Sequence, residues 1–277
     1  MPKTRMSRPR RENFGAAVSA AAIVALVACG DDPSAPSAAK PLAGQLVEPP
    51  PPASATAAPL DAAAPPDVAT PPGPPPDGSP PPLDLSAIQA LLSSCKEVST
   101  GRYKKDSEDS SSTVPICGLE NAVFWQADMD IDCDGKESAE CNETTDPWFM
   151  NETSGNDSSG NPLDSATLPF VVIPLKSTRF DYSKHGLKHG SVVMVIYKGK
   201  YEFGVFGDLG PAAIIGEASY AMAKKLGINP DPSVGGTSSG VTYVAFTGTT
   251  AVASKLEDHD EAVQIGNARA RQLLLDN

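Results

Sequence analysis

Short runs of apolar and β-branched residues, separated by polar turns, dominate the hydrophobic pattern of residues 84–277. The runs with the length and composition of strands are 122–131, 168–175, 190–197, 201–206 and 241–247. Helical periodicity is confined to 85–92, 217–226 and 256–274. Because the predicted strands outnumber the helices and are short, the pattern predicts a mainly β domain (β or α+β) with a few short helices, folded as a compact β-barrel.

Two carboxylates stand at predicted element boundaries between Val205 and Ser219. An apolar, aromatic-rich run ends at Asp208, a Gly-Pro turn follows, and Glu217 opens the predicted helix at 217–226. Side chains on rigid elements keep a fixed separation, which suits an acid and a base placed across a cleft. The alternative is structural, since Asp often forms turns and Glu often caps the first turn of a helix.

The N-terminal region differs from the rest of the chain in composition. Basic residues among positions 3–12 precede the uncharged run Phe14–Ala28, and together they indicate a secretory signal peptide at 1–28. The junction Leu26-Val27-Ala28-Cys29-Gly30 resembles a bacterial lipobox, so we expect Cys29 to be acylated as the mature N-terminus. An ordinary signal peptide cleaved near Ala28, which leaves Cys29 free, is the alternative.

Residues 31–82 contain 18 of the 28 prolines and no aromatic residue. Such a segment buries too little apolar surface to fold, and its proline runs favour an extended chain. We therefore expect a lipid-anchored Pro/Ala-rich linker at 29–83 and one folded domain at 84–277. The protein is predicted to be a monomer that is exported and either tethered to the cell envelope (outer membrane or cell surface) or secreted.

Charge and cysteine content narrow the possible partners and cofactors. A formal net charge of −12 disfavours nucleic acid as a partner and suits a polycation.

Four cysteines in an exported domain indicate two disulfides, and of the three possible pairings the short polar loops favour Cys95 with Cys117 and Cys133 with Cys141. No CxxC spacing or nearby histidine supports a competing zinc site, so we expect no metal and no cofactor. Histidines 185 and 189, in a Lys/Gly-rich loop, are expected to be solvated.

Alternate aspartates precede the glycine at position 135. From Asp130 the pattern D-x-D-x-D-G matches the first half of a calcium loop, but Cys141 stands where the bidentate glutamate is due, so bound calcium is kept only as an alternative. On a strand, Asp128, Asp130 and Asp132 project from one face, where three like charges need a cationic partner. Sugar stacking is one role for the aromatic residues, and packing in the core or at its rim is the more common alternative; these residues are Trp125, Trp148, Tyr182 and Tyr243.

Four blocks resemble, in their order, the signature of the glycoside hydrolase family 75 chitosanases. They are Ala127–Gly135, Pro169–Pro174, Phe206-Gly207-Asp208 and Gly216-Glu217-Ala218-Ser219. The resemblance implies that Asp208 and Glu217 are the essential catalytic pair of an endo-acting enzyme that cleaves β-1,4 glucosamine linkages of chitosan with inversion. We expect Glu217 to be the general acid and Asp208 the base, with Asp128, Asp130 and Asp132 binding the glucosamine ammonium groups.

Two further expectations follow from the same residues. The order of strand, Gly-Asp turn, short strand and helix resembles a double-psi β-barrel. The alternative function is a non-catalytic surface lipoprotein that binds a polycationic or cell-wall polysaccharide, with or without calcium. In that case binding would survive the loss of Glu217, whereas the enzyme would lose turnover with its fold intact.

Overall fold

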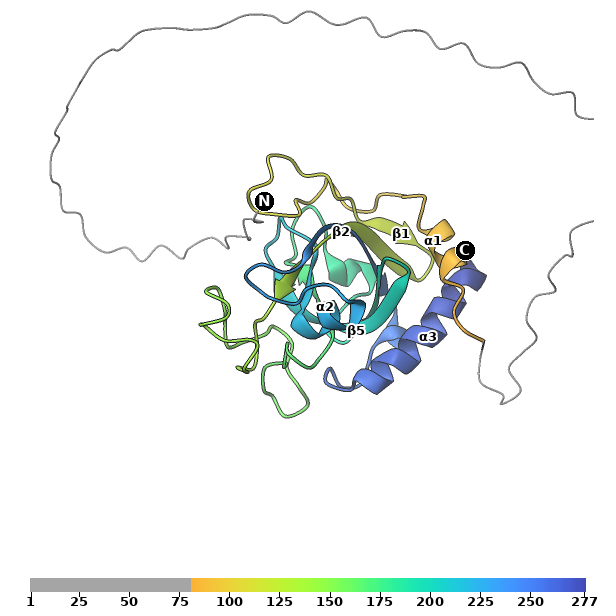
Figure 1. The fold of residues 1–277 in the computed structure, drawn as a ribbon. Helices are drawn as coiled ribbons and strands as arrows, with labels where there is room; N and C mark the ends of the chain where they lie inside the picture. The colour runs from red at the N-terminus through yellow and green to blue at the C-terminus, as the bar shows by residue number, and fades with distance from the viewer. Residues whose placement is uncertain (1–80) are drawn as a thin grey trace, which may run out of the picture. The chain divides into compact units, whose positions relative to one another are not determined.

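The computed structural model describes residues 81–277. The predicted signal peptide, the lipidation site Cys29 and most of the predicted linker lie outside the described residues. Along the chain the elements are α1 (Leu85–Leu91), β1 (Cys117–Leu119), β2 (Ala122–Asp132), β3 (Phe170–Pro174), β4 (Val192–Tyr197), β5 (Lys200–Gly210), β6 (Glu217–Ser219), α2 (Tyr220–Leu226), β7 (Thr237–Phe246) and α3 (His259–Asp276), with short 3₁₀ turns at Tyr182–His185 and Thr249–Ala251 (Figure 1).

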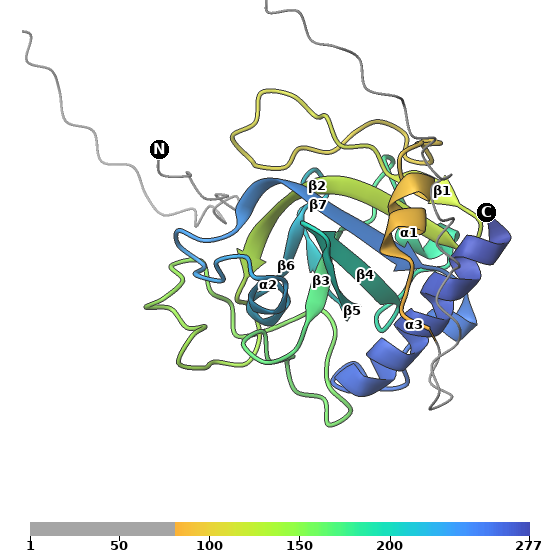
Figure 2. The ribbon, with the colours of Figure 1, turned by 45° about the vertical axis from the view of Figure 1, so that its right-hand side comes forward.

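Six of the strands close into a barrel (Figures 1 and 2). Their order is β2-β6-β3-β5-β4-β7, and β7 pairs back with β2, while β1 extends the sheet as a hairpin partner of β2. The β2–β6 and β3–β5 pairs are parallel and the other pairs are antiparallel. The prediction of a mainly β protein with a few helices, folded as a compact barrel, is confirmed; the double-psi connectivity stays a prediction.

Alternating strand residues supply two apolar cores. One face fills the barrel, where the rings of Trp125 and Tyr243 stack with centroids 5.2 Å apart. The other face, which includes Phe124 and Phe203, packs against α1 and α3. Figure 2 shows α3 lying along the outside of the barrel. For Trp125 and Tyr243 the alternative of core packing is therefore confirmed, because both side chains point into the barrel.

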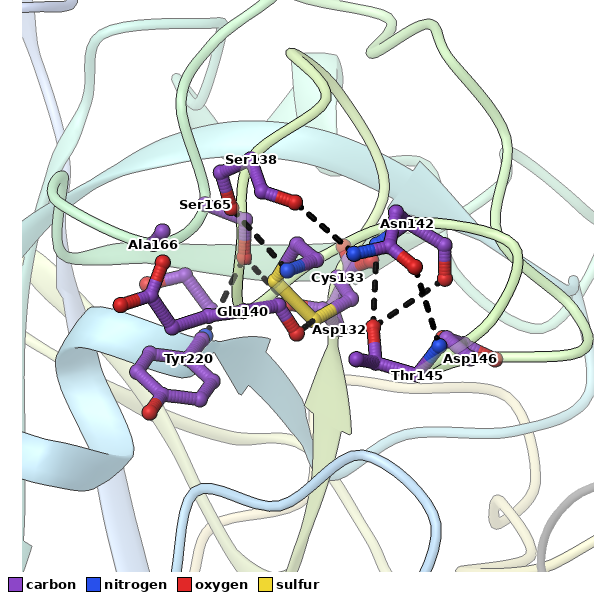
Figure 3. Close-up of a disulfide and its surroundings, with 12 residues drawn as sticks. Asp132, Cys133, Ser138, Glu140, Asn142, Thr145, Asp146, Ser165, Ala166 and Tyr220 are labelled. Atoms are coloured by element: carbon purple, nitrogen blue, oxygen red, sulfur yellow. Dashed lines mark hydrogen bonds between the residues drawn. A yellow bond between two sulfur atoms is a disulfide. The ribbon is translucent and has the colours of Figure 1, made fainter.

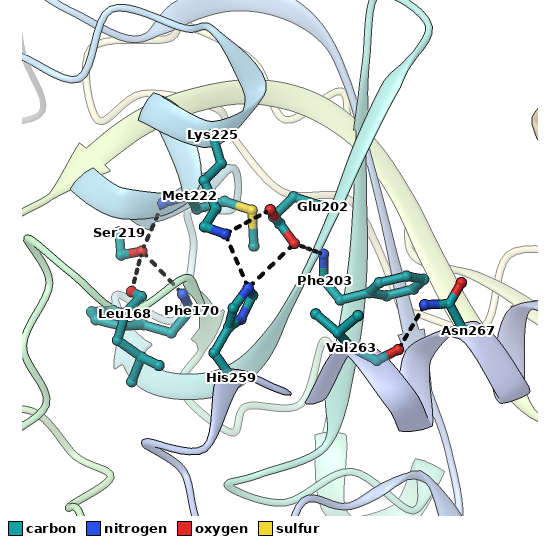
Figure 4. Close-up of polar contacts among 10 residues, drawn as sticks. All are labelled: Leu168, Phe170, Glu202, Phe203, Ser219, Met222, Lys225, His259, Val263 and Asn267. Carbon is teal, nitrogen blue, oxygen red and sulfur yellow. Dashed lines mark hydrogen bonds and ion pairs between the residues drawn. The ribbon is translucent and has the colours of Figure 1, made fainter. Parts of the chain in front are cut away.

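Helix α2 begins later than the sequence predicts. Ser219 is its N-cap: the hydroxyl accepts from Met222 N (3.2 Å) and Phe170 N (3.0 Å) and donates to Leu168 O (2.8 Å), so one side chain joins α2 to the start of β3 (Figure 4). Glu217 consequently lies on strand β6 and not in the first turn of a helix. The helix ends at Gly227, whose left-handed φ of 76° is favourable for glycine.

Both predicted disulfides are present, in the pairings that the loop lengths favoured. Cys95–Cys117 joins the segment after α1 to β1, and Cys133–Cys141 closes the start of the long connection between β2 and β3 (Figure 3). Beside the second bridge, Asn142 Nδ2 donates to Ser138 O (2.9 Å). Two disulfides indicate a protein that folds outside the reducing cytoplasm. Across residues 81–277, no helix has both the length and the apolar character needed to span a bilayer.

A polar cluster ties α2 and α3 to β5 (Figure 4). Glu202 of β5 forms an ion pair with Lys225 Nζ (3.3 Å) and lies 3.6 Å from His259 Nε2, and Lys225 Nζ lies 3.2 Å from the same imidazole nitrogen. Burial lowers the pKa of His259; the nearby charge of Glu202 opposes that shift and Lys225 adds to it. The neutral ring therefore accepts a hydrogen bond from Lys225 and remains uncharged below the pH at which an exposed histidine protonates.

This cluster predicts a loss of stability at mildly acidic pH. In the unfolded chain His259 takes up a proton near an ordinary pKa of about 6.5, whereas the folded protein resists protonation, so unfolding binds a proton and the free energy of unfolding falls as the pH drops below that value. Denaturant unfolding between pH 7 and pH 5 should show a steeper loss for the wild type than for His259→Gln. Both proteins retain His189, so equal slopes would contradict the assignment to His259.

Candidate active site

Strand register places Asp208 and Glu217 on either side of one residue of β3. Val172 pairs with Asp208 on β5 and with Glu217 on β6, and the next strand continues the row because Glu217 pairs with Asp130 on β2. Paired residues project from the same face of a sheet. The two carboxylates therefore flank Val172, and two strand spacings separate their Cα atoms by about 10 Å.

A β-bulge at Gly207 sets the direction of Asp208. Val171 pairs with Phe206 but Val172 pairs with Asp208, so Gly207 is the extra residue of β5. A Cβ at position 207 would lie only 2.7 Å from the Cβ of Phe170, which leaves room for glycine alone. Bulges of this kind re-aim neighbouring side chains. Asp208 lies within β5, since the strand continues to Gly210 and does not end at the aspartate as predicted.

Backbone donors and neighbouring carboxylates surround Asp208, which is 4% exposed. Its Oδ1 atom accepts from Ser154 N and from Leu209 N, each at 2.7 Å. Carboxylate oxygens of Asp208, Asp132 and Asp134 lie within 4.8 Å of one another, all buried. Asp132 Oδ1 accepts from Asp134 N at 2.8 Å, which fixes the turn after β2. Asp132 thus belongs to the surroundings of Asp208.

Glu217 is 9% exposed and leans across β3 toward β5. Its Oε2 atom lies 3.2 Å from the position that a Cβ of Gly210 would occupy, so the absence of a side chain there makes room for the carboxylate. Beneath this site the hydroxyl of Tyr243 donates to Asp128 O at 2.8 Å. Complete burial, together with the negative charges of Asp128, Asp130 and Glu217, raises the pKa of Tyr243 well above its ordinary value. The phenol therefore remains a protonated donor under the carboxylates.

An acidic cleft with a volume of about 280 Å³ adjoins Glu217 at Asp130. Its acidic lining consists of Asp106, Glu108, Asp109, Asp128 and Asp130. Residues 232–235 and Ser238 line the cleft as well. The three aspartates of β2 were predicted to bind the substrate together, but the structure separates them. Asp128 and Asp130 line the cleft, whereas Asp132 lies with Asp134 beside Asp208. A register shift between Ala127 and Met129 accompanies this change along β2.

The acidic residues at 106–109 were not predicted as part of any site. They lie in a polar segment without strand or helix periodicity, so the only signal was their charge.

The prediction of solvated histidines was also wrong. Half-buried His189 contacts Ser154 Oγ through Nε2 (2.9 Å), and His185 stacks on Phe180 with ring centroids 4.6 Å apart. Trp148, at 40% exposure, remains available for stacking on a sugar.

Glycoside hydrolases use a pair of carboxyl groups on either side of the sugar linkage. The two buried carboxylates on strands either side of β3, with an acidic cleft beside them, agree with that class of protein.

Comparison with known proteins identifies the family. A family model described as fungal chitosanase of glycosyl hydrolase group 75 matches residues 129–269. Endo-chitosanase B of Aspergillus oryzae (strain ATCC 42149 / RIB 40) is 28% identical over 195 residues, which cover 61% of this chain and 81% of that protein. An endo-chitosanase of the same strain is 31% identical over 186 residues, covering 59% and 75%. Endo-chitosanase C of Aspergillus oryzae is 36% identical over 138 residues, covering 48% and 34%. The chain belongs to the glycosyl hydrolase group 75 chitosanase family and is a glycoside hydrolase.

The fit of Glu217 against Gly210 predicts the effect of adding one methyl group. In Gly210→Ala the new Cβ would lie 2.9 Å from Val172 Cγ1 and 3.2 Å from Glu217 Oε2, so Val172 must shift and the carboxylate must give way by a few tenths of an ångström. We expect the hydrolytic rate to fall about tenfold to a hundredfold, with a stability loss of about 1–3 kcal/mol from overpacking. Steady-state kinetics and thermal unfolding measure both. Because the methyl acts through Glu217, the same change should cause no further loss of rate in Glu217→Gln; an additional loss there would contradict this account.

Proposed function

We propose that the protein is an endo-acting chitosanase that cleaves β-1,4 glucosamine linkages with inversion, using Asp208 and Glu217 as its two carboxylates. The observation that carries the proposal is the placement of both residues beside Val172, on strands either side of β3. An inverting enzyme needs space between its carboxyl groups for a water molecule, which requires about 6.5–9.5 Å, whereas a retaining pair lies about 5–5.5 Å apart. The Cα atoms of Asp208 and Glu217 lie a whole strand apart, which leaves room for the wider arrangement.

The surroundings of the two carboxylates support different roles. Asp208 accepts two short backbone hydrogen bonds, which hold its carboxylate in a fixed orientation. We therefore assign Asp208 as the general base that activates water. Glu217 pairs with Asp130 on β2, beside the acidic cleft in which we expect the sugar chain to bind. We assign Glu217 as the general acid that protonates the leaving oxygen.

The acidic cleft supports chitosan as the substrate. Glucosamine units carry ammonium groups, and the carboxylates of Asp106, Glu108, Asp109, Asp128 and Asp130 supply the opposite charge next to the proposed acid. The relatives in Aspergillus oryzae are named endo-chitosanases. The alternative of a non-catalytic binding protein has no such support, since the chain belongs to an enzyme family.

Replacing either catalytic carboxylate should abolish turnover without unfolding the protein. For Asp208→Asn and Glu217→Gln we expect reducing-end release from soluble chitosan to fall by about 10²- to 10⁴-fold, because each variant removes one partner of general acid–base catalysis. The exposed Glu137→Gln variant is the matched control and should retain wild-type activity. Retention of more than a tenth of the activity by either site variant, with a wild-type melting temperature, would refute this assignment.

Substitutions in the cleft should weaken binding more than chemistry. For the double variant Asp106→Asn/Glu108→Gln we expect the KM for chitosan to rise several-fold to about tenfold, with kcat nearly unchanged, because the lost charges face ammonium groups away from the cleaved bond. The difference from wild type should shrink at high salt, which screens the attraction. The exposed Glu143→Gln variant serves as the control. A fall in kcat at unchanged KM would contradict a binding role.

Export is supported by the two disulfides, whereas membrane attachment rests on the sequence alone. We infer that Cys29 is acylated and that the following Pro/Ala-rich linker separates the enzyme from the envelope. Mass spectrometry of the mature N-terminal peptide would identify either an acylated Cys29 or an unmodified terminus near Ala28, and the second result would refute the anchor.

A further inference from the structure

One short segment of the β2–β3 connection contacts β5 at Asp208. Ser154 N donates to Asp208 Oδ1 at 2.7 Å, and the next residue, Gly155, donates from its N–H to Gly207 O at 3.0 Å. Consecutive residues of the connection therefore bond to consecutive residues of β5. The position of Ser154 thus determines where the Oδ1 atom of Asp208 is held.

His189, in the segment before β4, contacts both Ser154 and the strand β5 that carries Asp208. Its ring lies on that of Phe206, with centroids 4.6 Å apart, and Gly190 N donates to Phe206 O at 3.0 Å. The Nε2 atom is 2.9 Å from Ser154 Oγ. A Cβ at position 155 would lie only 3.0 Å from His189 Cδ2. The imidazole is therefore packed between β5 and the segment that carries Ser154.

The remaining hydrogen bonds of this segment fix its shape. Thr153 Oγ1 donates to Gly155 O at 2.6 Å and accepts from Leu163 N at 2.9 Å. Both bonds lie within the connection, so they do not determine its distance from β5. The contacts that do so at Asp208 are the backbone bond of Gly155 and the side-chain bond between Ser154 and His189.

We propose that His189 is a positioning residue for the reaction: its hydrogen bond to Ser154 holds the Ser154 N–H against Asp208 and so fixes the orientation of the carboxylate that activates water. This inference rests on the proposed function, in which Asp208 is the general base. His189 does not touch the reacting atoms in this role, because it acts through Ser154. The consequence is a specific dependence of kcat on a residue outside the carboxylate pair.

The charges around the ring agree with this role. Burial lowers the pKa of His189, and the negative charge of Asp208 opposes that shift. The carboxylates of Asp132 and Asp134 lie on the Asp208 side as well. The ring is therefore uncharged at neutral pH and contributes a hydrogen-bonding atom and a stacking surface near Asp208.

The test compares two replacements of His189. His189→Phe keeps a flat ring on Phe206 but removes Nε2, and we expect kcat for chitosan to fall about tenfold or more, with KM changed less than twofold and the melting temperature preserved. His189→Gln, which restores a polar atom near the same place, should recover most of kcat. The matched control is His185→Phe, another histidine of the same segment that stacks on an aromatic ring, and it should behave as wild type.

A double-mutant cycle separates this role from general stability. Ser154→Ala removes the hydroxyl but keeps the N–H, so it should reproduce the kcat loss of His189→Phe, and the double variant should lose no more than either single variant. If His189→Phe does not fold, Ser154→Ala and His189→Gln still test the bond. Full kcat in Ser154→Ala, or a multiplicative loss in the double variant, would overturn the inference.

The Asp208→Asn background distinguishes the two proposals. If Asp208 is the base and His189 acts through it, Asp208→Asn is strongly impaired and adding His189→Phe causes no further loss. A fully active Asp208→Asn would overturn the proposed function and this inference with it. An impaired Asp208→Asn together with an unaffected His189→Phe would overturn the inference alone.

Discussion

Pairing of β3 with both β5 and β6 is the constraint on which the site depends. The sequence separates Asp208 from Glu217 by a turn and a short apolar segment, yet both residues align with Val172 because β6 returns along the other edge of β3. Two glycines let both carboxylates take up their positions beside Val172. Gly207 forms the bulge that directs Asp208, and Gly210 leaves the space that Glu217 occupies. A rigid closed sheet therefore holds the separation of the carboxylates, as the proposed two-carboxylate mechanism requires.

The site also concentrates negative charge, which costs stability in the absence of a cationic ligand. Backbone N–H groups of Ser154 and Leu209 bond to Asp208 and limit that cost. A polymer that carries ammonium groups would bring charge of the opposite sign to the cleft. The acidic composition of the chain and the local architecture of the cleft therefore agree with the same substrate class.

Local pattern predicted the barrel well but predicted the site only in part. The apolar runs of β2, β4 and β5 are long enough to be recognised as strands. The disulfide pairing was predicted correctly because each cysteine pair closes a short polar loop. Strand β6 has only three residues and is held by pairing with distant strands, so Glu217 was assigned to the helix that follows. The roles of His189 and of Asp106 depend on contacts between segments far apart in sequence, for which neither periodicity nor a motif gave a signal.

The most direct test of the central claim is the configuration of the first product. Proton NMR during hydrolysis of a β-1,4 glucosamine oligomer, recorded before the anomers equilibrate, shows whether the new reducing end is α or β. The inverting mechanism proposed for Asp208 and Glu217 predicts the α-anomer, because water attacks from the face opposite the leaving group. Initial formation of the β-anomer would show that one carboxylate acts as a nucleophile and would contradict the account.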